Sequence, residues 1–199
     1  MLNLLRKPGL TASVVGALVC IGTWAGPAEA STFQRMSLEK LAATNSTIVV
    51  GEVVDSYSYW NADGTFILTD VVIEKEGQIA GPPSKEHSMV LTVMGGSVDD
   101  LTTVVLGGAE LEVGKSYLLF VSKSDLPGVS QALTVRDHAQ GVFEVRPSAD
   151  GTLRAYSQAV DAHLLADENG RKAAPGGAAG LRFDEVIETI QATLNGEEK

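Results

Sequence analysis

The sequence contains a single cysteine, Cys20, in 199 residues. One cysteine cannot form an internal disulfide or a cysteine-based zinc site. Basic residues are also few, with 15 Lys and Arg against 25 Asp and Glu and a formal net charge of −10. This balance argues against a protein that binds nucleic acid or an anionic membrane through a basic surface. The 44% of hydrophobic residues is too high for a disordered chain, and the length favours one domain.

The N-terminus has the pattern of an export signal. Arg6 and Lys7 precede an uncharged, mainly apolar run from residue 10 to residue 24, and Ala28–Ala30 has the small-x-small pattern of a cleavage site. The run is shorter than the roughly 20 residues that a membrane-spanning helix needs. We therefore expect residues 1–30 to be a signal peptide and the product to be periplasmic or secreted, with no membrane span after cleavage. An uncleaved anchor and a lipoprotein modified at Cys20 are the alternatives.

Removal of residues 1–30 would change the product's chemistry. The segment carries two of the basic residues and one of the acidic residues, so the formal charge becomes −11. It also carries Cys20, so the product would be acidic, thiol-free and without disulfides. We expect a β-rich barrel domain at 31–166, a Gly- and Ala-rich linker or loop at 167–180, and a C-terminal helix at 181–199.

The region after the signal has mainly strand patterns. Ser37 is suited to cap a short helix from Leu38 to about Thr44. The later segments alternate apolar and polar residues or form short apolar runs between turn residues. The expected strands are 48–59, 65–75, 88–94, 101–106, 117–121, 131–136, 141–146 and 152–156.

These elements predict a mainly β fold. Asn61–Gly64 has the residues of a hairpin turn between the first two strands, and Gly51 interrupts an apolar run in the way that marks a β-bulge. Apolar residues from Phe183 to Leu194 recur at helical spacing, which predicts an amphipathic helix that packs on the sheet. We expect a small closed or partly open barrel, OB-like, with a short N-terminal helix and this C-terminal helix.

The sequence contains few groups that could perform catalysis. His87, His138 and His163 have no metal-site spacing, and no nucleophile motif with its partners is present. The pair Asp137-His138 lies on adjacent positions, which point to opposite faces of a strand. Oxygen-rich loops at 61–64 and 99–100 could supply oxygens to calcium, but they match neither the twelve-residue EF-hand loop nor the glycine-rich nonapeptide repeats. We therefore predict no catalytic residue, no metal and no cofactor, and no enzymatic activity.

Aromatic residues gather before the predicted hairpin turn. Tyr57 and Tyr59 share one strand face and Trp60 points to the other. Exposed rings at a hairpin tip could stack on a sugar or enter a partner's pocket, whereas ordinary packing would bury them. With Asn61 and Asp63 of the turn, these three residues are the candidate partner-binding residues.

Several motifs occur in a recognisable order along residues 38–146. They are the segment 48–53 (IVVGEV), Trp60, Asp63-Gly64, Thr69, Gly95-Gly96, the segment 113–120 (VGKSYLLF) and the segment 140–145 (QGVFEV). In this order the chain resembles a family of uncharacterised exported bacterial domains with an OB-like β-barrel, a module sometimes found beside secreted metalloproteases. Glu76-Gly77 and Lys115 depart from the family's usual residues. The resemblance implies a fold and no catalytic residues, since the motifs are turn glycines and core strands.

These observations predict an exported, non-enzymatic binding or accessory domain whose partner is a protein or a component of the cell envelope. Three alternatives stay open. The first is a protease inhibitor or metalloprotease-associated module, and the second is a small hydrolase that uses His138 or His87 with an acid. The third is a sugar-binding module that uses Tyr57, Tyr59 and Trp60. The sequence makes no prediction of the oligomeric state.

Overall fold

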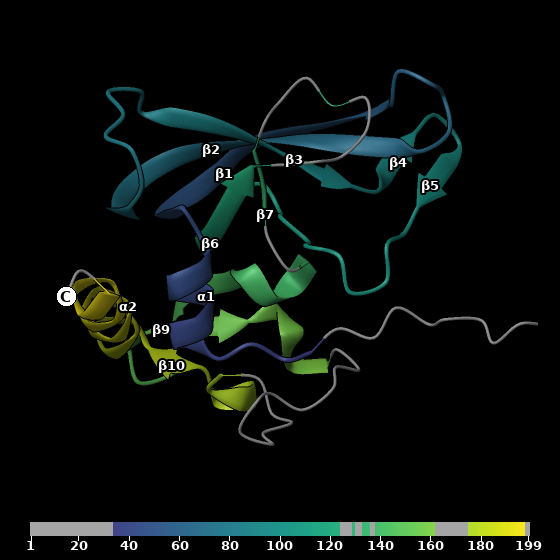
Figure 1. Ribbon diagram of the computed structural model, residues 1–199. Helices are drawn as coiled ribbons and strands as arrows, with labels where there is room; N and C mark the ends of the chain where they lie inside the picture. Colours follow the sequence, from purple (N-terminus) through teal and green to yellow (C-terminus); the bar gives the residue numbers. More distant parts are fainter. Residues whose placement is uncertain (1–33, 124–128, 130–132, 136–137, 162–174, 198–199) are drawn as a thin grey trace, which may run out of the picture. The chain divides into compact units, whose positions relative to one another are not determined.

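The computed structural model describes residues 34–123, 129, 133–135, 138–161 and 175–197 (Figure 1). The described residues form one compact unit. The predicted signal peptide, His163, Asp137 and residues 167–174 of the predicted linker lie outside the described residues. Within the described part, no helix is long and apolar enough to cross a membrane.

The structure is mainly β, as the sequence predicts. The helices are α1 (Leu38–Thr44) and α2 (Phe183–Glu197), with short 3₁₀ turns η1 (His138–Gly141), η2 (Gln158–Asp161) and η3 (Gly177–Ala179). The strands are β1 (Thr47–Trp60), β2 (Ile67–Ala80), β3 (Ser88–Met94), β4 (Gly96–Val98), β5 (Leu101–Thr103), β6 (Ser116–Lys123), β7 (Leu133–Val135), β8 (Val142–Pro147), β9 (Leu153–Ser157) and β10 (Leu181–Arg182).

Eight strands form one antiparallel sheet in the order β10-β9-β8-β6-β1-β2-β3, with β7 paired to β6 beside this path. One edge of β6 pairs with β1 along 116–121. Its other edge is shared, because 116–119 pair with β8 and 121–123 pair with β7. The strand is therefore central and buries both faces, which explains its uninterrupted apolar run.

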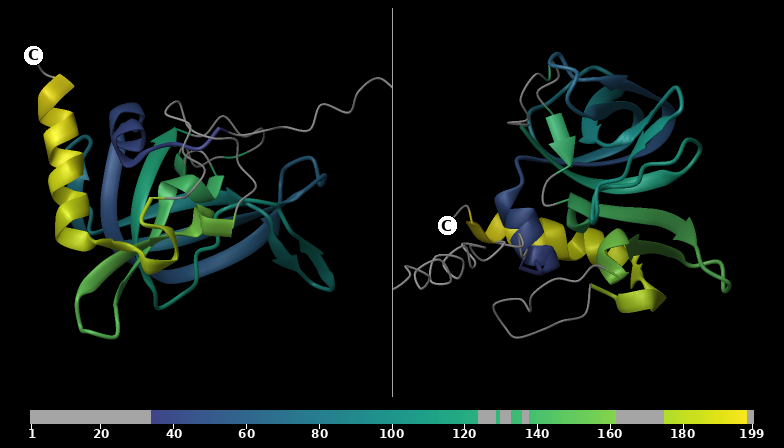
Figure 2. Two further views of the ribbon diagram at one scale, coloured as in Figure 1. Left: turned by 90° about the horizontal axis from the view of Figure 1, so that it is seen from below. Right: turned by 90° about the vertical axis from the view of Figure 1, so that its right-hand side faces the viewer.

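Two apolar cores lie on the two faces of this central region. Alternate residues of β6 divide between them, with Leu118 and Phe120 on one side and Leu119 and Val121 on the other. The first core is covered by α1 and α2, which lie side by side (Figures 1 and 2). The second core, here called the meander core, lies between β6, β7 and the inner faces of β1, β2 and β3.

Both helices begin as local chemistry predicts. The Ser37 side chain accepts a hydrogen bond of 3.2 Å from the Lys40 N–H and so caps α1. Asp184 and Glu185 occupy the first turn of α2, where negative charge suits the helix dipole. Val186 and Ile190 of α2 are buried in the first core, so this face of the helix packs on the sheet.

The long β1–β2 hairpin contains the expected bulge at Gly51, where the register shifts. A Cβ atom at this position would lie 2.4 Å from the Glu74 carbonyl oxygen, so the close approach requires glycine. The hairpin is longer than predicted. Residues 77–80 continue β2 rather than opening a loop, because they pair with 48–50 of β1.

Two sequence predictions need correction. The described residues contain no closed barrel, because the hydrogen-bonded order of strands runs from β10 to β3 without returning. β3 does lie close to β7, but the two have no hydrogen-bonded register in the described part of the chain. The predicted strand at 101–106 is also too long. Only 101–103 form a strand, and they pair with 96–98, a strand that the sequence analysis did not predict.

Candidate functional site

The five candidate partner-binding residues lie at one end of the β1–β2 hairpin, but the structure places them differently. Tyr57 is 57% exposed, Trp60 and Asp63 are exposed, and Tyr59 is half-buried. Asn61 is only 3% exposed. The five residues therefore do not form one exposed surface, and each is described with its own contacts.

Asn61 holds the hairpin turn together. Its side-chain oxygen accepts hydrogen bonds from the Thr65 and Phe66 N–H groups at 2.8 and 3.1 Å, and its amide donates to the Thr65 hydroxyl at 3.0 Å. Gly64 adopts a positive φ of 63° and donates from its N–H to the Asn61 carbonyl oxygen. These bonds use the polar atoms of Asn61 inside the turn.

Tyr57 and Tyr59 converge on one carboxylate, that of Asp70 on β2. The Tyr57 hydroxyl donates to Asp70 Oδ2 at 3.2 Å, and the Tyr59 hydroxyl donates to Asp70 Oδ1 at 3.0 Å. The Thr92 hydroxyl on β3 donates to the same Oδ1 at 2.6 Å. The two rings are 5.7 Å apart between centroids and tilted by 33°. Asp70 was not predicted as a site residue, because only the strand register brings it opposite Tyr57.

The carboxylate changes the acidity of both phenols. The negative charge of Asp70 and the hydrogen bond to it raise the pKa of Tyr57 above its ordinary value. Burial raises the pKa of Tyr59, and the hydrogen bond to Asp70 raises it further. Both hydroxyls therefore stay protonated as donors to the carboxylate at neutral pH.

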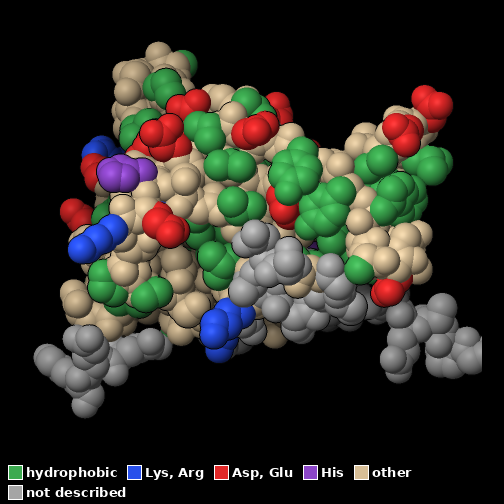
Figure 3. Space-filling model, turned by 90° about the horizontal axis from the view of Figure 1, so that it is seen from above, with side chains coloured by type: hydrophobic (Ala, Val, Ile, Leu, Met, Phe, Trp, Pro, Cys, Tyr) green, Lys and Arg blue, Asp and Glu red, His purple; other side chains and the backbone are tan. Residues whose placement is uncertain are grey.

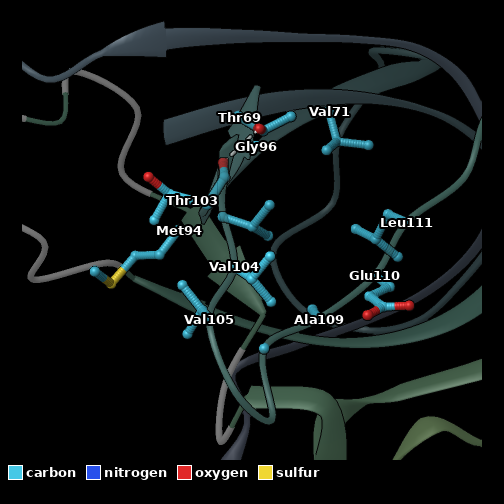
Figure 4. A pocket seen from close by; sticks show the side chains of 13 residues that line it. Thr69, Val71, Met94, Gly96, Thr103, Val104, Val105, Ala109, Glu110 and Leu111 are labelled. Carbon is cyan, nitrogen blue, oxygen red and sulfur yellow. Dashed lines mark hydrogen bonds between the residues drawn. The ribbon is translucent and has the colours of Figure 1, made fainter. Parts of the chain in front are cut away.

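A pocket of about 210 Å³ lies on the opposite face of the same part of β2. Three stretches line it: β2 at Thr69 and Val71, the end of β3 with Gly95 and Gly96, and the segment 103–111 (Figure 4). Val71 belongs to the meander core, and Ala109 and Leu111 pack against that core. The pocket is therefore an apolar opening onto the end of the meander core.

A small polar cluster fixes one wall of the pocket. The Thr69 hydroxyl donates to the Gly95 carbonyl oxygen at 2.7 Å and lies 2.8 Å from the Ser58 hydroxyl. Gly96, at φ 126°, packs so closely that a Cβ atom there would lie 2.2 Å from Thr69 Oγ1 and 2.3 Å from Ser58 Oγ. The β4–β5 hairpin is thus attached to β1 and β2 through Gly96, and its two-residue turn is Asp99-Asp100.

The opposite wall belongs to the irregular segment 104–115, of which 104, 105 and 108–111 line the pocket, and hydrogen bonds hold it in place. The Ala139 N–H donates to the Gly107 carbonyl oxygen at 3.0 Å. The Gln158 side-chain amide pairs with the backbone of Glu110, accepting from its N–H at 3.0 Å and donating to its carbonyl oxygen. The pocket is consequently pre-formed although one of its walls has no regular secondary structure.

Large apolar side chains are exposed in the strands and loop that form this pocket, and Met94 and Val104 line it. Val104 is 74% exposed and Leu106 is 94% exposed, and Met94 and Leu101 are also exposed. The sequence analysis assigned 101–106 to a strand and missed this surface. Its apolar residues were indistinguishable from those of a buried strand, because a short apolar run does not reveal which face it packs against.

The histidines and acidic loops make no further site among the residues that the structure describes. His87 is exposed, His138 lies in η1, and neither lines the pocket. No group of three or more His, Cys, Asp or Glu residues in the described ranges could hold a metal ion.

Comparison with known proteins gives no assignment. No protein-family model matches the chain, and no curated protein matches it. The functional argument therefore rests on the geometry of this chain.

Proposed function

We propose that this chain is an exported binding domain without enzymatic activity, and that its partner is a protein. The observation that carries the proposal is the pre-formed apolar pocket beside the exposed side chains of Val104 and Leu106. Exposed apolar side chains that gather on a small domain mark interaction surfaces more often than single ones do. A partner's apolar side chain would fill the pocket, while Val104 and Leu106 would pack against the partner's surface.

The size of the pocket favours a protein side chain over a small-molecule ligand. Sites for small molecules usually measure about 300–1,000 Å³, whereas this pocket measures about 210 Å³. Its lining from β2 and from residues 103–111 is mainly apolar, with Glu110 as the charged residue at its edge. A single Leu, Met or Phe side chain of the partner would fill such a pocket, and the surrounding contacts with the partner would exclude water from it.

The strand order supports an OB-like arrangement as the finer description of the fold. β1, β2 and β3 form a meander, β6 pairs with the free edge of β1, and β7 pairs with β6 and lies close to β3. We propose a partly open OB-like barrel made of these five strands. In this arrangement β2 and β3 would be the second and third strands, which together with the adjoining loops form the usual ligand-binding region of OB-folds.

The export part of the proposal rests on the signal pattern of residues 1–30. Mass spectrometry of the protein recovered from periplasm and medium tests it. The expected product begins at Ser31, and recovery of the intact chain from the cytoplasm alone would contradict export.

The binding proposal is tested by affinity capture from envelope and culture fractions with three single variants. V104D and L106D place a charge on the proposed surface. L153D places the same charge on a similarly apolar residue, 44% exposed, in the distant β8–β9 hairpin. We expect V104D and L106D to reduce capture of a partner at least about tenfold, as substitutions at an interface centre do.

L153D should leave the capture unchanged. Equal loss in all three variants, or no partner above background with the unaltered protein, would overturn the proposal. Circular dichroism of each variant checks that the fold is retained.

A further inference from the structure

Asp70 is a buried carboxylate without a positive partner. It is 5% exposed, and its three hydrogen-bond donors are the hydroxyls of Tyr57, Tyr59 and Thr92. No Lys or Arg in the described part of the chain forms an ion pair with it. Burying a charge is costly unless an opposite charge compensates it. The hydroxyls satisfy the carboxylate oxygens, but the negative charge itself remains uncompensated.

Two aromatic rings lie next to this charge. Both tyrosine hydroxyls are engaged by Asp70, so the rings are the parts of these side chains that remain for a ligand. Tyr57 is the more exposed of the pair. A phenol that donates a hydrogen bond to a carboxylate gains electron density in its ring. The face of such a ring attracts cations through its quadrupole.

The surrounding strand face is acidic as well. The inner positions of β1, β2 and β3 belong to the meander core, so the register assigns the alternate positions to the outward face. Glu52, Asp55 and Glu74 occupy such positions in addition to Asp70. No outward position in the paired registers of the three strands is occupied by Lys or Arg. Figure 3 shows acidic side chains spread over this side of the molecule around exposed apolar groups. The face is complementary to a positively charged ligand.

We propose that the outward face of the β1–β2–β3 meander recognises a lysine or arginine side chain of a basic protein segment. The cation stacks on Tyr57 and Tyr59, and the uncompensated charge of Asp70 attracts it from the side of the sheet. A neutral sugar could use the rings but would gain little from the carboxylates. A bare metal ion would need Asp70 oxygens, which the three hydroxyls occupy.

The inference is independent of the apolar pocket. Asp70 points to the outward face, whereas its neighbours Thr69 and Val71 line the pocket on the other face of β2. Variants on one face therefore leave the residues of the other face in place. V104D should not alter binding of a basic peptide, so failure of this inference and failure of the proposed function can be distinguished.

Titration calorimetry with an oligo-arginine peptide, and with a citrulline peptide of the same length, tests the proposal. Citrulline keeps the shape of arginine but carries no charge. We expect measurable affinity for the arginine peptide alone. Y57L, which removes the most exposed ring, should weaken it roughly 3- to 30-fold, the range of a cation–π contact. D70N, which removes the buried charge, should weaken it at least about threefold.

E86Q is the matched control for D70N, because it removes one negative charge from an exposed position in the loop before β3. It should change the affinity less than twofold. Equal weakening by E86Q and D70N would reduce the effect to general charge attraction and overturn the proposal. Equal binding of the citrulline peptide, or binding of a neutral oligosaccharide that D70N leaves intact, would also overturn it. If D70N fails to fold, the affinity of Y57L for the arginine peptide tests the proposal, because the Tyr57 side chain is largely exposed and its replacement should leave the fold intact.

Discussion

Tyr57 and Asp70 face each other across β1 and β2, and the Tyr57 hydroxyl donates a hydrogen bond of 3.2 Å to the Asp70 carboxylate. Tyr59, two residues further along β1, reaches the same carboxylate from the same face. A partly exposed aromatic pair is thereby held by a charge that it also shields from water. This contact links the hairpin tip, where the sequence predicted candidate binding residues, to Asp70, which was not among them.

The Tyr57–Asp70 contact predicts how the two phenols titrate. D70N should lower the pKa of Tyr57 towards the ordinary value of 10.0, because it removes the charge that opposes the phenolate. It should lower the pKa of Tyr59 less, because burial, the main cause there, remains. Ultraviolet absorbance of the phenolate measures this, and D63N is the control. In the unaltered protein the raised values stabilise the fold below pH 10. That contribution disappears as the pH rises through the folded-state pKa values. Identical titration curves for D70N and D63N would contradict the assignment.

The hydrogen bonds of Asn61 predict that the hairpin turn depends on this side chain for its stability. N61A removes an acceptor for two backbone N–H groups and a donor to Thr65, so we expect a loss of about 1–3 kcal/mol in the free energy of unfolding. D63A, at an exposed position in the same turn, should change it by less than about 0.5 kcal/mol. Urea denaturation measures both. A neutral N61A would show that the turn forms without these bonds.

The close packing around Gly96 predicts that the pocket wall accepts only glycine at this position. G96A would put a Cβ atom into the Thr69 and Ser58 hydroxyls at a backbone φ that side chains rarely adopt. We expect destabilisation of about 1–3 kcal/mol from the backbone strain alone and displacement of the β4–β5 hairpin. G77A is the matched control, because nothing lies within 4 Å of a Cβ atom at Gly77. Thermal unfolding distinguishes the two, and equal midpoints would contradict the close packing.

The hydrogen bonds in the β8–β9 turn predict that the Asp150 carboxyl titrates at low pH. Hydrogen bonds from the Ser148 hydroxyl and the Thr152 N–H lower the pKa of Asp150 from 3.8 to about 2. Because the folded-state value is depressed, its stabilising contribution is present above pH 3.8 and is lost as the pH falls towards 2. S148A should return the pKa towards 3.8. Carboxyl NMR titration measures the change, and an unshifted pKa in S148A would exclude the serine as the cause.

Local chemistry in the sequence predicts much of the fold. The Ser37 cap, the Asn61–Gly64 turn, the bulge at Gly51 and the apolar stripe of α2 each depend on residues close together in the chain. Alternation also predicts correctly that Tyr57 and Tyr59 share a strand face. Such features are decided by backbone conformation and side-chain spacing, which neighbouring residues control.

Strand order and register could not be obtained in the same way. Alternation assigns residues to a face but gives neither the register nor the neighbouring strand. The hairpin was predicted, but Asp70 lies opposite Tyr57 only because the strands end at Trp60 and Ile67, and the shared edge of β6 depends on strands further along the chain. The exposed side chains at Val104 and Leu106 were misread for a related reason, since a short apolar run looks the same in a core and on a surface.

The sequence by itself determined a mainly β chain with a helix before and after its strands, because the hydrophobic period and the turn and cap residues are local. Only the tertiary structure decided where its candidate binding groups lie. The buried Asp70 charge and the aromatic pair depend on the register of the β1–β2 hairpin and on Thr92 of β3, and the pocket on the other face of β2 needs the segment 103–111 beside these strands, none of which local spacing specifies.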